Sequence, residues 1–231
     1  MKKNQPLQPA FDVWLAPVRL NYWGMTWQEA EVFIKLFRAK TTERIAALEK
    51  NVRSTPGFED WHADFTAESR CRLGPWLLTV GKTTPVDPDD VHVEVFKPGL
   101  SPETIACMEM VAKEIVNLEL TETTGAMAVD IGIYVGEAVR LEYPSVQWQR
   151  CKAKCDDNHN YPLLELTTNW GGNPIRLFCN FAMALLEGRF EAACFERIFG
   201  DWMGGAAETE DYRQRKISKK LNAKKKKGKS T

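Results

Sequence analysis

The sequence predicts an α+β fold, a mostly helical single domain with a small antiparallel sheet. Apolar residues recur at helical spacing along most of the chain. Two stretches, SVQWQRCKA and YPLLELTT, form the best candidate strand pair, and the polar loop KCDDNHN separates them. The chain has 231 residues, enough to bury a sizeable core as one domain or as two small lobes.

The N-terminal segment 1–25 contains several prolines and large aromatic rings. We expect it to form an ordered arm against the body, because so many rings are rarely left in water. A globular domain is expected over 26–205. Its first helix should begin after Thr26, where a glutamate three residues later completes a capping box. A shorter helix should begin after Thr66 and end at Gly81.

Two further segments lie outside the expected helices and the strand pair. Residues 82–100 are interpreted as a linker with one short strand at Val91–Phe96. Residues 206–231 are expected to form a disordered basic tail. The remaining helices are expected at Ser101–Leu118, at about Glu122–Glu142, at Ile175–Glu187 and at about Phe190–Trp202.

The stretch VDIGIYVGEAVR places Gly132 and Gly136 four residues apart inside an expected helix. Each glycine there costs about 1 kcal/mol relative to alanine. Small residues four apart allow a second backbone to come close, so we interpret the pair as a packing groove. The expected partner is the apolar helix Ile175–Glu187, which Asn173 should cap ahead of Pro174.

Polar residues occupy another face of the same helix. At 100° per residue, Asp130, Tyr134 and Glu137 share one narrow arc, and Arg140 follows one turn later. Asp130 lies between two large apolar residues, and a carboxylate near a core needs a partner. We expect that partner to be Arg176 or the side-chain amide of Asn173.

The chain offers weak signals for metal binding and catalysis. Cys151, Cys155 and His159 recur at spacings of four, whereas zinc knuckles usually have two intervening residues and a second ligand pair. We therefore expect a polar hairpin loop and no metal. None of the three histidines lies in a recognisable triad or nucleophile elbow. The sequence accordingly predicts neither a catalytic residue nor a cofactor.

The formal net charge of zero hides a division along the chain. Residues 212–231 contain ten lysines or arginines and no acid, which leaves 21 basic and 31 acidic residues in 1–211. The body is therefore formally −10 and the tail +10. A basic tail, with Lys224–Lys229 at its end, can bind nucleic acid by counterion release, or it can fold back onto the acidic body.

The cellular compartment is inferred from the length and position of the apolar segments. No apolar run approaches the roughly 18 residues needed to span a bilayer. The N-terminus has no apolar signal segment and no small-residue cleavage site. We therefore expect a cytoplasmic protein.

Three parts of the sequence carry a resemblance. AVDIGIYVGEAVRLEYPSVQWQ, YPLLEL and NPIRLFCNFAMALLEG together resemble a family of uncharacterised bacterial proteins, some of them immunity proteins of polymorphic toxin systems. The family pattern is a D-x-G-x-Y-x-G-E-x-x-R helix, a tryptophan-bearing strand, a second strand and an N-P-hydrophobic helix. ADFTAESRCRLGPWLL resembles its short helix. The likeness covers about residues 26–200 and implies fold and context rather than a reaction.

The sequence therefore predicts a non-enzymatic, cytosolic immunity protein that binds and neutralises a cognate toxin. An acidic body would speed the capture of a basic toxin. The expected contact residues are loop acids: Asp87, Asp89, Asp90, Asp156 and Asp157. Two alternatives stay open at this point. One is a small hydrolase that uses Asp130, Glu137 and Arg140, and the other is a nucleic-acid-associated protein that acts through its tail.

Overall fold

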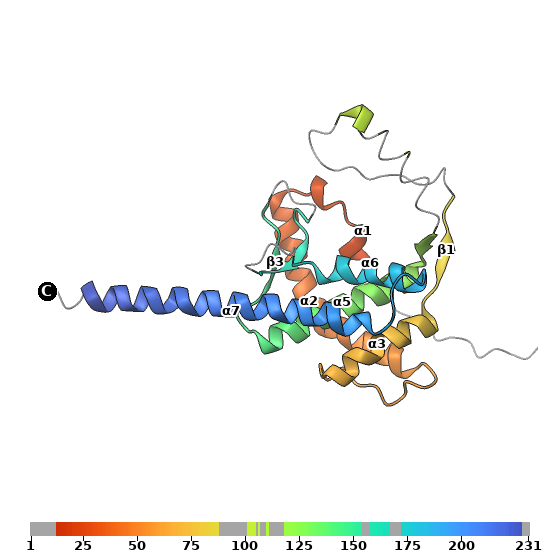
Figure 1. The fold of residues 1–231 in the computed structure, drawn as a ribbon. Coiled ribbons are helices and arrows are strands. Elements are labelled where there is room, and N and C mark those ends of the chain that lie inside the picture. Colours follow the sequence, from red (N-terminus) through yellow and green to blue (C-terminus); the bar gives the residue numbers. More distant parts are fainter. Residues whose placement is uncertain are drawn as a thin grey trace, which may run out of the picture.

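The computed structural model describes residues 13–87, 101–104, 106, 110, 118–153, 158–166 and 172–227. Helix α5 (Glu122–Glu142) lies at its centre and contacts helices α2, α3, α6 and α7 (Figure 1). Fifteen of the 21 residues of α5 are buried. The predicted class is confirmed as a mostly helical α+β domain, with two two-stranded antiparallel sheets.

The described part of the N-terminal arm packs against α2 (Trp27–Arg53). It contains a one-turn helix, α1 (Ala16–Arg19), and a 3₁₀ turn, η1 (Tyr22–Gly24). Trp14 stacks on Phe37 of α2, with ring centroids 6.1 Å apart, and Tyr22 is buried. Residues 13–25 are thus held against the body by their aromatic rings, whereas residues 1–12 of the expected arm lie outside the described residues.

Both early helices begin at the expected caps. At the start of α2, the Thr26 hydroxyl accepts from the backbone of Glu29, whose carboxylate accepts in return from the Thr26 backbone. Helix α3 (Ala67–Val80) begins with the Thr66 hydroxyl accepting from Ser69, and Gly81 follows its last residue. Each cap satisfies a backbone N–H that the first turn leaves free.

One of the two sheets was predicted and the other was not. Strands β3 (Trp148–Arg150) and β4 (Pro162–Leu164) pair antiparallel inside the two stretches expected to form a strand pair. Strands β1 (Thr83–Pro85) and β2 (Leu118–Leu120) pair across the expected linker. Leu118 therefore begins a strand and does not end a helix. The strand expected at 91–96 and most of the helix expected at 101–118 lie outside the described residues.

Helix α6 (Pro174–Leu186) matches the apolar helix of the sequence. Pro174 occupies its first turn, and the Asn173 side chain accepts from the Arg176 backbone at 3.0 Å. Among the described helices, none combines the length and the apolar character needed to cross a bilayer.

The last helix differs most from expectation. Helix α7 begins at Cys194 and continues to Lys227, so the described part of the basic tail is helical and not disordered. No glycine or proline interrupts 206–227, and its alanines, glutamates, glutamines and lysines are good helix formers. Ala206 and Thr209 are buried, so the packed face of α7 also extends past the domain boundary expected at 205. The terminal part of α7 extends away from the body and does not fold back onto it (Figure 1).

Candidate functional site

The polar face of α5 begins with a buried ion pair. Asp130 accepts two hydrogen bonds from Arg44 of α2, from Nε at 2.8 Å and from Nη2 at 2.7 Å. Both side chains are 1% exposed. The planar guanidinium matches the carboxylate in two places, which compensates both charges away from water. The expected partners were wrong, because Arg176 is exposed and the Asn173 amide donates to Asn158 at 2.9 Å.

Tyr134, one turn later on α5, connects this helix to the start of α3 and to the turn before it. Its hydroxyl accepts from the Phe65 backbone at 2.8 Å and lies 2.7 Å from the Ser69 hydroxyl. Ser69 donates its proton to the Thr66 carbonyl, so Tyr134 is the donor to Ser69. Phe65 has a left-handed φ of 62° and stacks on the Tyr134 ring. Burial raises the pKa of the Tyr134 hydroxyl, which stays protonated as this arrangement requires.

Glu137 faces the β3–β4 hairpin. Its carboxylate accepts from the indole nitrogen of Trp148 at 2.7 Å and from Arg140 at 2.6 Å. Arg140 also donates to Gln147 beside the start of β3. The same carboxylate therefore orients the central tryptophan of the hairpin and the arginine that ends the motif.

The three polar residues of the arc therefore contact three different elements. Asp130 contacts α2, Tyr134 contacts the turn before α3, and Glu137 contacts β3. Asp130 is closed off from solvent by its pairing with Arg44. A substrate therefore cannot contact Asp130 together with Glu137 and Arg140 in this structure, and the arc acts as an internal hub.

The two glycines of the motif serve two different neighbours. A Cβ on Gly132 would lie 2.6 Å from the Cα of Ile175 and 3.0 Å from the Pro174 carbonyl oxygen, so α6 approaches here as the packing groove predicts. A Cβ on Gly136 would instead overlap the Trp148 ring. Gly132 therefore makes room for the backbone of α6, and Gly136 makes room for the Trp148 side chain of β3.

A second buried polar network, centred on Arg150 of β3, was missed from the sequence. Its Nε donates to Glu31 at 3.1 Å and its Nη1 to Asn160 at 2.8 Å. The Asn160 amide in turn donates to the carbonyls of Tyr22 and Met25. Arg150 and Asn160 are both buried. The hairpin is thereby connected to α2 and to the arm, and no local sequence signal indicates these partners.

The expected metal candidates have other surroundings. Cys151 is buried in the hairpin, and the His159 ring nitrogen Nδ1 lies 3.1 Å from the Ala153 carbonyl. Cys155 lies outside the described residues. Within the part of the chain that the structure describes, no three His, Cys, Asp or Glu side chains gather as a metal site would require.

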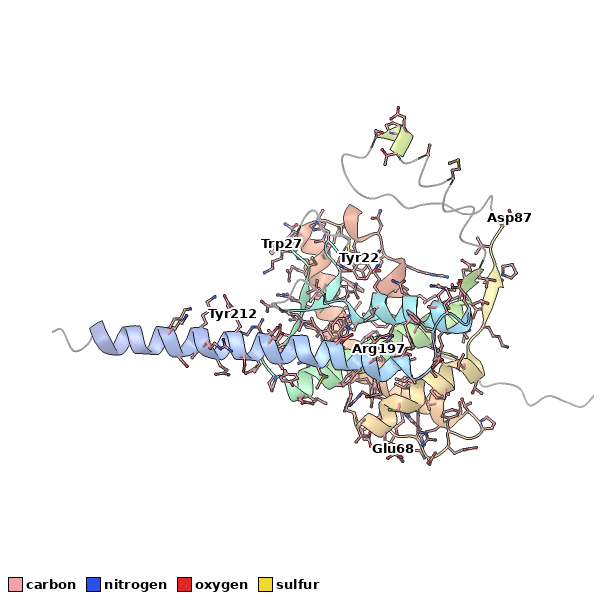
Figure 2. All side chains as sticks on the ribbon, viewed as in Figure 1. Tyr22, Trp27, Glu68, Asp87, Arg197 and Tyr212 are labelled. Atoms are coloured by element: carbon pink, nitrogen blue, oxygen red, sulfur yellow. The ribbon has the colours of Figure 1, made fainter. Side chains whose placement is uncertain are left out.

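Of the loop acids expected to contact a partner, the structure describes one. Asp87 is exposed just after β1, at the edge of the body (Figure 2). Asp89, Asp90, Asp156 and Asp157 lie outside the described residues.

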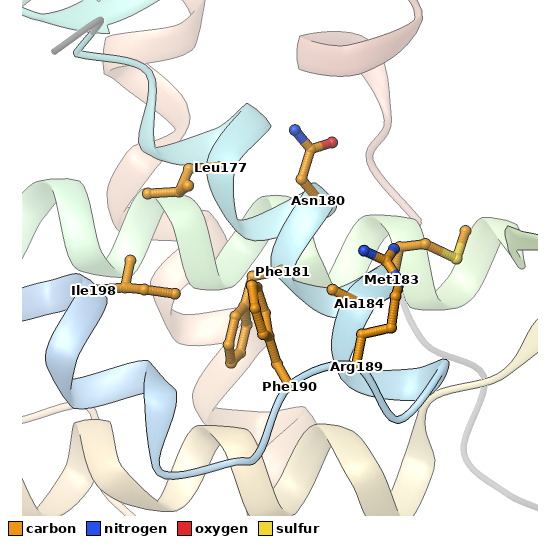
Figure 3. A pocket seen from close by; sticks show the side chains of 8 residues that line it. All are labelled: Leu177, Asn180, Phe181, Met183, Ala184, Arg189, Phe190 and Ile198. Atoms are coloured by element: carbon orange, nitrogen blue, oxygen red, sulfur yellow. The ribbon is translucent and has the colours of Figure 1, made fainter.

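A shallow pocket opens between α6 and the start of α7 (Figure 3). Its volume is about 350 Å³, and Phe190 at its edge stacks on Phe181 with ring centroids 6.0 Å apart. Its lining is mostly apolar, with Asn180 and Arg189 as the polar residues. The lining residues are Leu177, Asn180, Phe181, Met183, Ala184, Arg189, Phe190 and Ile198.

Comparison with known proteins returns no likeness. No protein-family model, no curated protein and no solved structure matches the chain.

Removing the Tyr134 hydroxyl tests the hub directly. We expect Tyr134→Phe to lower the free energy of unfolding by about 1–3 kcal/mol, because the Phe65 N–H loses its acceptor. Urea unfolding measures this. Tyr212→Phe is the matched control, since that hydroxyl is on an exposed ring and its removal should leave the midpoint unchanged. Equal midpoints for both variants would show that Tyr134 contributes only its ring.

Proposed function

We propose that this protein acts by binding, as a cytosolic immunity protein that captures a basic toxin on its acidic body. The observation that carries the proposal is the charge division, with residues 1–211 formally −10. Opposite charge speeds the encounter of two proteins and selects against partners of the wrong sign. An immunity protein needs tight occupancy and no turnover.

The internal roles of the α5 motif support this proposal. Asp130, Tyr134 and Glu137 fix the positions of α2, α3 and the hairpin. The hub therefore produces a rigid body whose surface is available for recognition. A rigid surface loses little conformational entropy when it binds, which favours long residence. The D-x-G-x-Y-x-G-E-x-x-R pattern, which resembles that of uncharacterised bacterial proteins, some of them immunity proteins, leads to the same proposal.

Protection from a toxin is the test. The probe is the product of the gene adjacent to this one, co-expressed with the full chain in bacteria. We expect the neighbour to be toxic alone and growth to be restored by this protein. Removing residues 214–231 should leave protection intact, because that segment has the same charge sign as the expected toxin and Arg213 keeps its contacts with Glu165. A neighbour that is harmless alone would contradict the proposal.

Charge reversal locates the contact surface. Changing Asp87, Asp89 and Asp90 to lysine should slow association with the toxin about tenfold at low salt and much less above 0.3 M, where screening is strong. The matched control reverses three exposed acids elsewhere. These are Glu142, Glu191 and Glu208. Equal slowing by both triple variants would place the contact elsewhere and reduce the effect to net charge alone.

A further inference from the structure

The end of α7 is a charged surface that the proposed function leaves unused. After Asp211 the chain contains no acid, and all ten basic residues of 212–231 follow it. Arg215, Lys216, Lys219 and Lys220 are exposed on the helix. Its backbone stays helical through Lys227. These four exposed cations are thus carried by a helix whose direction the structure defines.

Arg213 marks the point where α7 leaves the body. It donates to the Ser145 carbonyl and pairs with the Glu165 carboxylate at 2.9 Å. Tyr212 beside it is already half exposed (Figure 2). From Tyr212 to Lys227 the helix extends roughly 24 Å at 1.5 Å per residue. This distance exceeds the Debye length of about 10 Å at 0.1 M salt, so the acidic body does little to repel a polyanion at the far end.

We propose that this basic helix, residues 212–227, binds double-stranded DNA through the phosphate backbone without reading sequence. A helix with its side chains is about 10–12 Å wide, and the B-DNA major groove is about 12 Å wide. In such a groove, the exposed Arg215, Lys216, Lys219 and Lys220 would lie beside the phosphates of the duplex. Release of condensed counterions supplies the affinity.

Other polyanions fit the helix less well. Single strands are held by aromatic stacking, and no aromatic residue follows Tyr212. A-form RNA has a deep, narrow major groove that excludes a helix. A membrane-surface helix needs a broad apolar face, whereas Ile217 and Leu221 are the only large apolar residues beyond Tyr212. Duplex DNA is the class that both the charge and the shape favour.

The test uses the full chain and a fluorescein-labelled 20-base-pair duplex of mixed sequence, followed by anisotropy. If the helix makes about five phosphate contacts, the affinity for the duplex should fall about 500-fold between 50 and 200 mM salt. Lys219→Glu with Lys220→Glu should weaken binding at least tenfold at 50 mM salt and make the salt dependence shallower. Lys35→Glu with Lys50→Glu makes the same charge change on exposed lysines of α2 and should alter binding less than threefold.

Three results would overturn the proposal. One is an equal loss of DNA binding when Lys219 and Lys220 are changed to glutamate and when Lys35 and Lys50 are changed to glutamate. Another is binding to vesicles with 30% phosphatidylserine, lost in the α7 variant, without binding to the duplex. The third is salt-sensitive self-association in sedimentation equilibrium, lost in the α7 variant, again without duplex binding. Toxin protection is a separate readout, because it should survive removal of 214–231, whereas DNA binding should not.

Discussion

Asp130→Ala is expected to lower the free energy of unfolding by about 3–5 kcal/mol, because it leaves the Arg44 guanidinium charged and buried without its partner. Both side chains are 1% exposed, so water cannot replace the lost carboxylate without opening the contact between α2 and α5. Urea denaturation followed by circular dichroism measures the change as a shift of the midpoint at constant slope.

A double variant separates the contribution of the ion pair to stability from that of the volume that its two side chains fill. Arg44→Met combined with Asp130→Val removes both charges and keeps a similar combined volume. We expect it to be clearly more stable than Asp130→Ala alone, since replacing a whole buried pair by apolar groups is often nearly neutral. Asp211→Ala is the surface control, because its pairing with Arg215 is exposed and should contribute nothing measurable. If the effects of Arg44→Met and Asp130→Val, each made singly, sum to the effect of the double variant, the two side chains are not a coupled pair.

Gly132→Ala is expected to destabilise the protein by about 2 kcal/mol, although alanine is the better helix former. The added Cβ would lie 2.6 Å from the Cα and 3.0 Å from the nitrogen of Ile175. These are backbone atoms at the first turn of α6, so a rotamer change cannot relieve the overlap. Helix α6 must shift, and its contacts with α5 weaken. Thermal or urea unfolding of the purified variant measures the loss.

The matched control for this prediction is Gly200→Ala in α7, where an added Cβ meets nothing within 4 Å. There the substitution should stabilise the protein by up to about 1 kcal/mol through helix propensity. Opposite signs for the two variants are the expected result. If both stabilise the protein, the close approach at Gly132 is not part of the native packing.

The elements with local signals were predicted from the sequence. The caps at Thr26 and Thr66, and the Asn173–Pro174 start of α6, lie where the sequence places them. Helix α5 has the expected bounds, and the β3–β4 hairpin forms inside the two stretches expected to pair as strands. Each of these depends on residues within a few positions of one another, so the pattern is complete in a short stretch of chain.

The residues that contact the α5 motif could not be predicted from the sequence, because tertiary structure brings them together. Arg44 is 86 residues from Asp130, and in sequence it is one of three arginines on an amphipathic helix. Strands β1 and β2 have three residues each and pair across a long segment, so neither has enough alternation to be recognised. The contact of Gly136 with Trp148 likewise joins a helix to a strand.

The sequence by itself determined helices α2, α3, α5 and α6, the caps of α2, α3 and α6, the hairpin and the charge division, because these follow from propensity, periodicity and composition. Only the tertiary structure decided where the charges lie. It buried Asp130 against Arg44 and directed the terminal part of α7 away from the body. The physical reason is that a buried carboxylate accepts whichever donor the packing of whole helices brings within 3 Å. A helix without a breaker likewise continues past the body that it packs on.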